Sequence, residues 1–209
     1  MNPLSKIICI CGPSGAGKSS LMERTVEVLD DSVSFYFDAY QSTLISPDPA
    51  DVYQRIVTGE IADPMDVVRK EIKNDKFVAD LKALRQGHEI IDPWNRKLQP
   101  AKYILVEEPF GRLREGMDEL IHTVVCIDLP LEIALCRRVI RNLTYDYRIE
   151  PAESRLDYVL NYVKGFHDGE GMAIKWLQEK LKETSELILD GLHPKERLVE
   201  ELVTSITNL

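Results

Sequence analysis

A glycine-rich segment that begins at Gly12 has the residue types and spacing needed to bind a chain of phosphates. Residues 12–19 fit the pattern G-x-x-x-x-G-K-S and directly follow the apolar run 7–11. Glycines let backbone N–H groups approach phosphate oxygens closely, Lys18 would reach the β and γ phosphates, and Ser19 would give its hydroxyl to Mg²⁺. The candidate ATP-binding residues of this loop are Gly12, Pro13, Ser14, Gly15, Ala16, Gly17, Lys18, Ser19 and Ser20.

The segment after this loop, residues 18–29, has apolar residues at helical spacing. We therefore expect a helix whose N-terminus points its positive dipole and unpaired N–H groups at the phosphates. The alternative is a glycine-rich turn that contains Lys-Ser by chance. A β-rich strand before the loop and an amphipathic helix after it favour the phosphate-binding interpretation, so the sequence predicts a nucleotide polyphosphate as ligand.

Two carboxylates stand at the ends of predicted strands, where ligands bind in an open α/β sheet. Asp38 ends the β-rich run 32–38, and Glu107 lies at the end of the apolar run 102–108. Asp38 could accept a proton from a substrate hydroxyl that attacks the γ-phosphate, and Glu107 could hold Mg²⁺ through water. Alternatively, either acid only caps a helix or a turn. Glu108 faces the other way in a strand and is the weaker metal candidate.

A cluster of arginines lies in and after the helix that Pro130 is expected to open. Arg137 and Arg138 each share a helical face with Arg141. Such a cluster could neutralise the charge of a loose phosphoryl-transfer transition state. Alternatively, the arginines complement the negative end of the helix dipole. Arg148 extends the basic patch into the following loop.

Predicted strands and helices alternate along the chain, which indicates an α/β protein. The strands are nearly continuous apolar runs, as is typical of parallel strands covered on both faces. We therefore expect a three-layer P-loop NTPase fold with a mostly parallel sheet of about five strands and a helical lid. Residues 47–64 predict a long irregular excursion. The other expected elements are strands at 123–128 and 186–190 and helices at 65–73, 75–85, from Pro130, over 152–183 with interruptions at its glycines, and from Pro194.

The composition favours one globular domain. The chain has 209 residues, of which 44% are hydrophobic, so we expect a single domain over 1–209 with a substrate-side insertion at 41–100 and the lid at about 137–150. A net charge of -9 argues against strong nonspecific binding to nucleic acid. The N-terminal residues leave no room for a cleavable signal and no apolar run approaches ~18 residues, so we expect a cytoplasmic protein without a membrane partner.

The four cysteines, at positions 9, 11, 126 and 136, fall in apolar segments and lack C-x-x-C spacing. We expect buried, reduced thiols rather than a zinc site or disulfides. The sequence leaves the oligomeric state open, including a homo-oligomer.

With these residues in view, the chain resembles the uridine kinase-like branch of P-loop kinases, which also contains phosphoribulokinase and bacterial-type pantothenate kinase. The resemblance runs in order over nearly the whole length. Residues 12–19 are similar to that family's G-x-S-G-[SA]-G-K-[ST], and residues 37–40 resemble its D-x-[FY]-Y region. Further similar segments are 81–87 to L-x-x-L-x-x-G, 90–93 to V-x-x-P, 104–107 to I-x-x-E-G, 135–142 to L-x-R-R-[IV]-x-R-D, and 185–191 to the closing A-D-x-[IV]-[IL] strand.

The resemblance implies an ATP- and Mg²⁺-dependent small-molecule kinase with Asp38 as general base and a mobile arginine-bearing lid. Either Asp63 or Asp66, in a reduced form of the family's N-F-D-H-P-D segment, would contact a substrate hydroxyl. The implied catalytic residues are Lys18, Asp38, Arg138 and Arg141, and the ATP site gains Arg137 and Arg141. The substrate candidates are Asp38, Tyr40, Asp63, Asp66, Arg138 and Arg148. The metal candidates are Ser19 and Glu107.

The chain departs from the family's pattern where uridine kinases recognise the pyrimidine. Their P-x-Y-D-F and T-H-S-R segments supply an aromatic residue and a histidine, whereas residues 93–98 contain neither that tyrosine nor such a histidine. Asn142 replaces the lid aspartate, and Glu108 replaces the glycine after the strand acid. These departures concern the acceptor and leave the phosphate-transfer residues in place.

Two functions fit these residues. The first is an ATP-dependent kinase that phosphorylates a hydroxyl of a nucleoside-, sugar- or pantothenate-like molecule. The second is a nucleotide-binding regulatory ATPase without a small-molecule acceptor, which the acid pair Glu107 and Glu108 favours because it could position water. A GTPase is disfavoured, since the chain has no N-K-x-D guanine motif.

Overall fold

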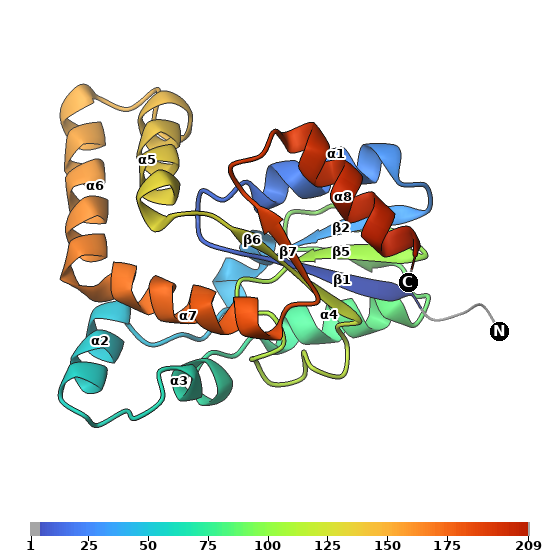
Figure 1. The fold of residues 1–209 in the computed structure, drawn as a ribbon, viewed down its shortest axis with the longest axis horizontal. Coiled ribbons are helices and arrows are strands. Elements are labelled where there is room, and N and C mark those ends of the chain that lie inside the picture. Colours follow the sequence, from blue (N-terminus) through green and yellow to red (C-terminus); the bar gives the residue numbers. More distant parts are fainter. Residues whose placement is uncertain (1–4, 209) are drawn as a thin grey trace.

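The protein is built around one parallel sheet, whose strands lie between two groups of helices in Figure 1. The computed structural model describes residues 5–208, with the side chains of all of these except 49 and 50, so residues 1–4 and 209 of the predicted domain lie outside the described part. The sheet has five strands in the order β2-β5-β1-β6-β7. This arrangement confirms the predicted parallel α/β fold. The strands are β1 (Lys6–Cys11), β2 (Ser32–Tyr36), β5 (Tyr103–Glu107), β6 (Thr123–Asp128) and β7 (Leu187–Asp190).

The central strand β1 is apolar at almost every position because both of its faces are covered. Successive side chains of a strand point to opposite faces. Ile7 and Cys9 belong to the hydrophobic cluster on one face, and Ile8 and Ile10 belong to the cluster on the other. The helices complete three layers (Figure 1): α1 (Lys18–Val28) and α8 (Lys195–Thr207) cover one face, and α4 (Asp75–Arg85) and α7 (Gly171–Thr184) cover the other.

The parallel register brings the C-terminal ends of three strands to one edge of the sheet. Glu107, the last residue of β5, is paired with Ile10 of β1 on one side and with Tyr36 of β2 on the other. The loop after β1, the segment after β2 and the last carboxylate of β5 therefore start from neighbouring points. Ligands bind at this kind of edge in α/β sheets.

Two helical segments project from the sheet and form a hairpin (Figure 1). The α5 helix (Leu131–Arg141) continues through a π-helical turn, η2 (Asn142–Asp146), and the chain returns in α6 (Ala152–Gly165). Arg138 of α5 lies with its guanidinium carbon 6.0 Å from the centre of the Tyr162 ring of α6. The predicted lid, 137–150, covers the end of α5 and the turn of this hairpin.

The predicted irregular excursion at 47–64 contains a helix, α2 (Pro49–Val57), which corrects that prediction. The Pro and Asp residues of the segment indicated a loop, whereas the four-residue spacing of Val52 and Ile56 fits a helix with one apolar face. Both side chains line one apolar pocket. A short helix, α3 (Met65–Lys70), follows. The chain then adds a two-stranded hairpin of β3 (Ile90–Ile91) and β4 (Lys97–Leu98) that the sequence did not predict.

The α2 helix packs against η3 (Phe166–Glu170), the turn that joins α6 to α7. Gly169 has a φ of +145°, and a Cβ at this position would lie 2.3 Å from Cγ of Tyr53. Only glycine fits both this backbone and this contact. The contact joins α2 to the turn between α6 and α7.

Cys9, Cys11 and Cys126 are buried and free, as predicted, whereas Cys136 is exposed. The expectation that all four thiols are buried is therefore wrong at Cys136, which lies on the amphipathic α5 helix in an apolar sequence segment but on the helix's open side. Within residues 5–208, no helix is both long and apolar enough to cross a membrane.

Candidate functional site

A cleft of about 390 Å³ opens where β1, β2 and β5 end. It brings together residues from four separate parts of the chain: the loop after β1, the turn after β2, the end of β5 and the last turns of α5. The residues that line it are Gly12, Ser14, Gly15, Gly17, Lys18, Ser19, Ser20, Phe37, Asp38, Gln41, Glu107, Pro109, Arg137, Arg138 and Arg141.

The glycine-rich loop packs directly against the backbone of α5. Gly15 has a φ of +89°, and a Cβ there would lie 2.4 Å from the carbonyl oxygen of Ala134. The α1 helix begins at Lys18, so its N-terminal N–H groups point into the cleft, as an anion site requires. The Lys18 ammonium donates a hydrogen bond to the Pro13 carbonyl at 3.2 Å. The lysine is thus held at the mouth of the loop.

Glu107 is the buried acid of the cleft. Its Oε1 lies 3.7 Å from Nζ of Lys18, and its Oε2 accepts a hydrogen bond of 3.2 Å from the Ser19 hydroxyl. Burial raises the pKa of Glu107 above its ordinary value; Lys18 and the Ser19 hydrogen bond oppose that rise, and the charge of Asp38 adds to it. The carboxylate therefore gains from any additional cation that enters the cleft.

The oxygens of Ser19 and Glu107 form a donor set that fits Mg²⁺. Mg²⁺ prefers oxygen ligands and is commonly held by one or two protein groups together with phosphate oxygens and water. Within the described residues, no group of three or more His, Cys, Asp or Glu side chains could hold a metal by itself. A cation at Ser19 and Glu107 would therefore complete its coordination with a nucleotide.

Asp38 lines the same cleft as the loop, but it does not stand at the end of a strand as predicted. The β2 strand ends at Tyr36, and Asp38 is the second residue of a 3₁₀ turn, η1 (Phe37–Thr43). Its side chain is exposed, and its Oδ1 accepts a weak hydrogen bond from Nε2 of Gln41 at 3.5 Å. The turn presents the carboxylate to solvent, where a substrate hydroxyl can reach it.

The arginines of α5 close one side of the cleft. Arg137 donates hydrogen bonds of 3.3 Å to the Gly191 carbonyl, which ties it to the loop after β7. Nε of Arg138 is buried and has no hydrogen-bond partner among the described residues. Arg141 is 52% exposed and is held by Asp146 at 3.1 Å. Each of the three guanidinium groups thus has donors left for an anion.

A sequence model of the Phosphoribulokinase / Uridine kinase family matches residues 7–164. The chain belongs to this family. The match includes the phosphate loop, Asp38, Glu107 and the α5 arginines, which confirms the resemblance read from the motifs. Members of the family are small-molecule kinases that typically use ATP. No curated protein matches the sequence.

Solved structures similar to this chain are distant from it in sequence. A possible uridine kinase from Bacillus stearothermophilus is 13% identical, with a TM-score of 0.51 and 91% of each chain covered. A putative fructose transport system kinase from Silicibacter sp. TM1040 is 11% identical, with a TM-score of 0.49 and 90% of each chain covered. The tunicamycin resistance protein of Deinococcus radiodurans is 16% identical, with a TM-score of 0.48 and coverage of 97% of this chain and 95% of that one. At such identities the first of these supports the fold alone.

Four residues that the family resemblance implied for substrate do not line the cleft. Tyr40 is fully buried and donates a hydrogen bond of 2.9 Å to Asp80. Asp63 and Asp66 lie at the start of α3 and pair with Arg69 at 3.0 and 3.1 Å. The pKa of Asp63 is lowered by the Met65 backbone N–H and then by Arg69, and that of Asp66 by Lys70 and then by Arg69. The fourth is Arg148, which is exposed, with its guanidinium over the Tyr145 ring.

Sequence reasoning missed three residues of the cleft, Phe37, Gln41 and Pro109. Gln41 is three positions after Asp38, a spacing that would have indicated contact had the turn been recognised as helical. Phe37 and Pro109 are next to the two acids in the sequence. Neither side chain can transfer a proton or bind a phosphate or a metal ion, so the sequence offered no chemical reason to select it.

Glu108 is fully buried and faces away from the cleft. Its carboxylate binds the guanidinium of Arg114, which is itself buried and lies over the rings of Phe37 and Phe77. It also accepts a hydrogen bond of 3.1 Å from the Phe110 backbone N–H. The pair Glu107 and Glu108 therefore does not act together, which removes the feature that favoured a water-positioning ATPase.

We expect Arg114→Met to lower the free energy of unfolding by about 3 to 5 kcal/mol, because it leaves the buried Glu108 charge without a partner. Urea unfolding measures the loss. The change should be smaller at pH 5 than at pH 8: burial already raises the pKa of Glu108, Arg114 opposes that rise, and the unpaired acid therefore takes up a proton as the pH falls.

The matched control for this variant is Arg197→Met, at an exposed pair on α8, which should change stability by less than about 1 kcal/mol. The double variant Arg114→Met with Glu108→Gln should be more stable than Arg114→Met alone. Equal losses in the buried and the exposed arginine variants would contradict the importance of the Glu108 contact.

Proposed function

We propose that the protein transfers the γ-phosphate of ATP to a hydroxyl of a small molecule. The observation that supports this most strongly is the cleft, which is lined by a phosphate-binding loop, an exposed carboxylate and three arginines. The exposed Asp38 can accept a proton from a substrate hydroxyl that enters this cleft, whereas in an ATPase it would act on water, so the two functions differ in the acceptor. The proposal is in keeping with membership of a family of small-molecule kinases.

The donor side of the proposed site consists of the loop and Glu107. The backbone N–H groups of the loop and Lys18 bind the β and γ phosphates. Ser19 and Glu107 hold Mg²⁺, which when bound neutralises charge on the phosphates. Arg137, tied to Gly191, holds the nucleotide against the sheet.

On the acceptor side, Asp38 accepts the proton of the substrate hydroxyl as its oxygen attacks the γ-phosphorus. The new P–O bond forms while the bond to the β–γ bridging oxygen breaks, and ADP leaves with that oxygen. Arg138 and Arg141 bind the charge that develops on the transferred group. The products are a phosphate ester and ADP.

The experiment that tests this proposal measures ADP release with and without a panel of nucleosides, ribose derivatives, pantothenate and glycerate. We expect at least one class to raise turnover well above the rate with ATP alone, and the ester to be detected by phosphorus NMR. If ATP binds and no compound raises turnover, the regulatory ATPase is the better assignment.

We expect Arg141→Ala to slow phosphate transfer about 100-fold while changing ATP affinity much less, because its half-exposed guanidinium is available to the transferred group. Single-turnover rates and the Kd for ATP measure the two effects separately. Arg197→Ala on α8 is the matched control and should change neither. Equal losses of rate and affinity would make Arg141 a binding residue only.

A further inference from the structure

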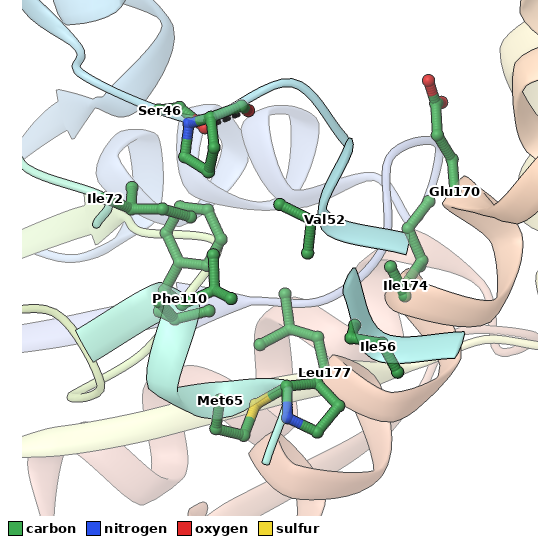
Figure 2. Close-up of a pocket in the computed structure, with 14 residues that line it drawn as sticks. Ser46, Val52, Ile56, Met65, Ile72, Phe110, Glu170, Ile174 and Leu177 are labelled. Carbon is green, nitrogen blue, oxygen red and sulfur yellow. Dashed lines mark hydrogen bonds between the residues drawn. The ribbon is translucent and has the colours of Figure 1, made fainter. Parts of the chain in front are cut away.

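A second cavity of about 290 Å³ lies between α2, α3 and α7 (Figure 2). Its walls are almost entirely apolar. Figure 2 shows Val52, Ile174, Leu177 and Phe110 around one hollow, while the carboxylate of Glu170 points away from them. Ile56 and Met65 complete the lining on the side of the insertion. Nothing in the proposed transfer chemistry uses these side chains, so the cavity needs a separate explanation.

This apolar pocket is next to the phosphate cleft. Phe110 lines the pocket, Phe37 lines the cleft, and the two rings meet edge to face with their centroids 6.0 Å apart. The residues that adjoin this ring pair in the sequence, Asp38 and Pro109, both line the cleft. The pocket and the cleft therefore adjoin at this pair of rings, one residue before Asp38 in the sequence.

The pocket is built by segments that are far apart in the sequence. Val52 and Ile56 come from α2, and Ile174 and Leu177 come from α7. The two sides are held together where Tyr53 packs against Gly169 without room for a side chain. The pocket thus exists only in the folded chain, because neither segment forms it alone.

The volume and chemistry of the pocket define the class of its occupant. An apolar cavity of ~150 Å³ can bind benzene, so 290 Å³ leaves room for a group of about bicyclic size. Hydroxyl-rich or charged groups would lose their hydrogen bonds to water there without replacement. Small-molecule sites combine such apolar walls with a few polar groups that fix orientation.

We propose that the phosphate acceptor is an alcohol with an apolar group of about bicyclic size, which this pocket binds while the hydroxyl extends past Phe37 to Asp38. This inference rests on the proposed kinase function. It narrows the acceptor to an amphipathic alcohol and makes the insertion helix α2 a determinant of specificity.

The test uses 2-naphthalenemethanol as probe, with ribose as the polar comparison. Binding is followed by naphthalene fluorescence, and transfer by ADP release and phosphorus NMR. Val52→Phe and Ile174→Phe fill the pocket from opposite walls, and Val57→Phe, at an exposed position of α2, is the matched control. We expect each pocket-filling variant to bind the probe about tenfold more weakly than wild type, with ATP affinity unchanged and Val57→Phe like wild type.

The proposal is overturned if wild type does not bind the probe, or if wild type and both filled variants bind it equally. If in that case ribose is phosphorylated, the kinase function stands without the apolar pocket. If the probe binds in a pocket-dependent way but neither it nor any compound of the polar panel is phosphorylated, the proposed transfer fails and with it the assignment of the ligand as acceptor. Asp38→Asn should bind the probe like wild type.

Discussion

An Asp38→Asn variant should transfer phosphate about 10²- to 10⁴-fold more slowly than wild type and bind ATP with unchanged affinity. The expectation follows from where the side chain lies: it lines the same cleft as the phosphate loop and is exposed to an incoming hydroxyl. Asparagine keeps the size of the side chain and its contact with Gln41 but cannot accept the proton. Single-turnover rates with a panel acceptor and the Kd for ATP measure both quantities.

The same substitution also acts on Glu107. The charge of Asp38 raises the pKa of Glu107, so its removal favours the ionised form of that carboxylate. Titration of the Asp38→Asn enzyme with Mg²⁺ separates a slower transfer step from a changed cation site. Asp118→Asn, at an exposed carboxylate in the loop after β5, serves as the control and should be as active as wild type. Full activity of Asp38→Asn would refute the general-base role.

A Lys18→Ala variant should lose about 10²- to 10³-fold in transfer rate, and should also bind ATP more weakly. Lys18 is a fixed ammonium group at the mouth of the loop, bonded to the Pro13 carbonyl and close to Glu107. The substitution removes a phosphate contact and at the same time leaves Glu107 with one opposite charge fewer. Unlike Asp38→Asn, it should therefore affect nucleotide affinity as well as rate.

Isothermal titration with a non-hydrolysable ATP analogue separates these two effects of Lys18→Ala. The control Lys195→Ala changes an exposed lysine at the start of α8 and should leave binding and rate unaltered. An active Lys18→Ala enzyme with normal ATP affinity would contradict the assignment of the donor site. It would also remove the basis on which the acceptor side is assigned.

The cleft residues that we propose as the donor side could be named from the sequence because each carries a local signal. The loop and the start of α1 form one continuous segment, and Glu107 ends a strand whose apolar run is evident. Asp38 lines the cleft as well, although η1 rather than the end of a strand carries it. Local sequence and the parallel sheet are sufficient for these positions.

The acceptor pocket that we propose could not be predicted in the same way, since it depends on contacts between distant segments. The role of Glu108 could not be predicted either, because its pairing with Arg114 gives no periodic signal and only the folded chain shows that Glu108 is buried. The apolar pocket forms where residues of α2 and α7 come together. The sequence did not predict α2, because the Pro and Asp content of that segment indicated a loop. Pattern reasoning within one segment does not reveal such a neighbour.

The contact between Tyr53 and Gly169 constrains its two positions unequally. A Cβ at position 169 meets the ring of Tyr53 and also strains the backbone, whereas a smaller residue at position 53 meets neither obstacle. Loss of the tyrosine ring removes only the first obstacle, because the φ of +145° still strains any other residue at position 169. Evolution can therefore alter this contact through α2, while the turn before α7 has to keep its glycine.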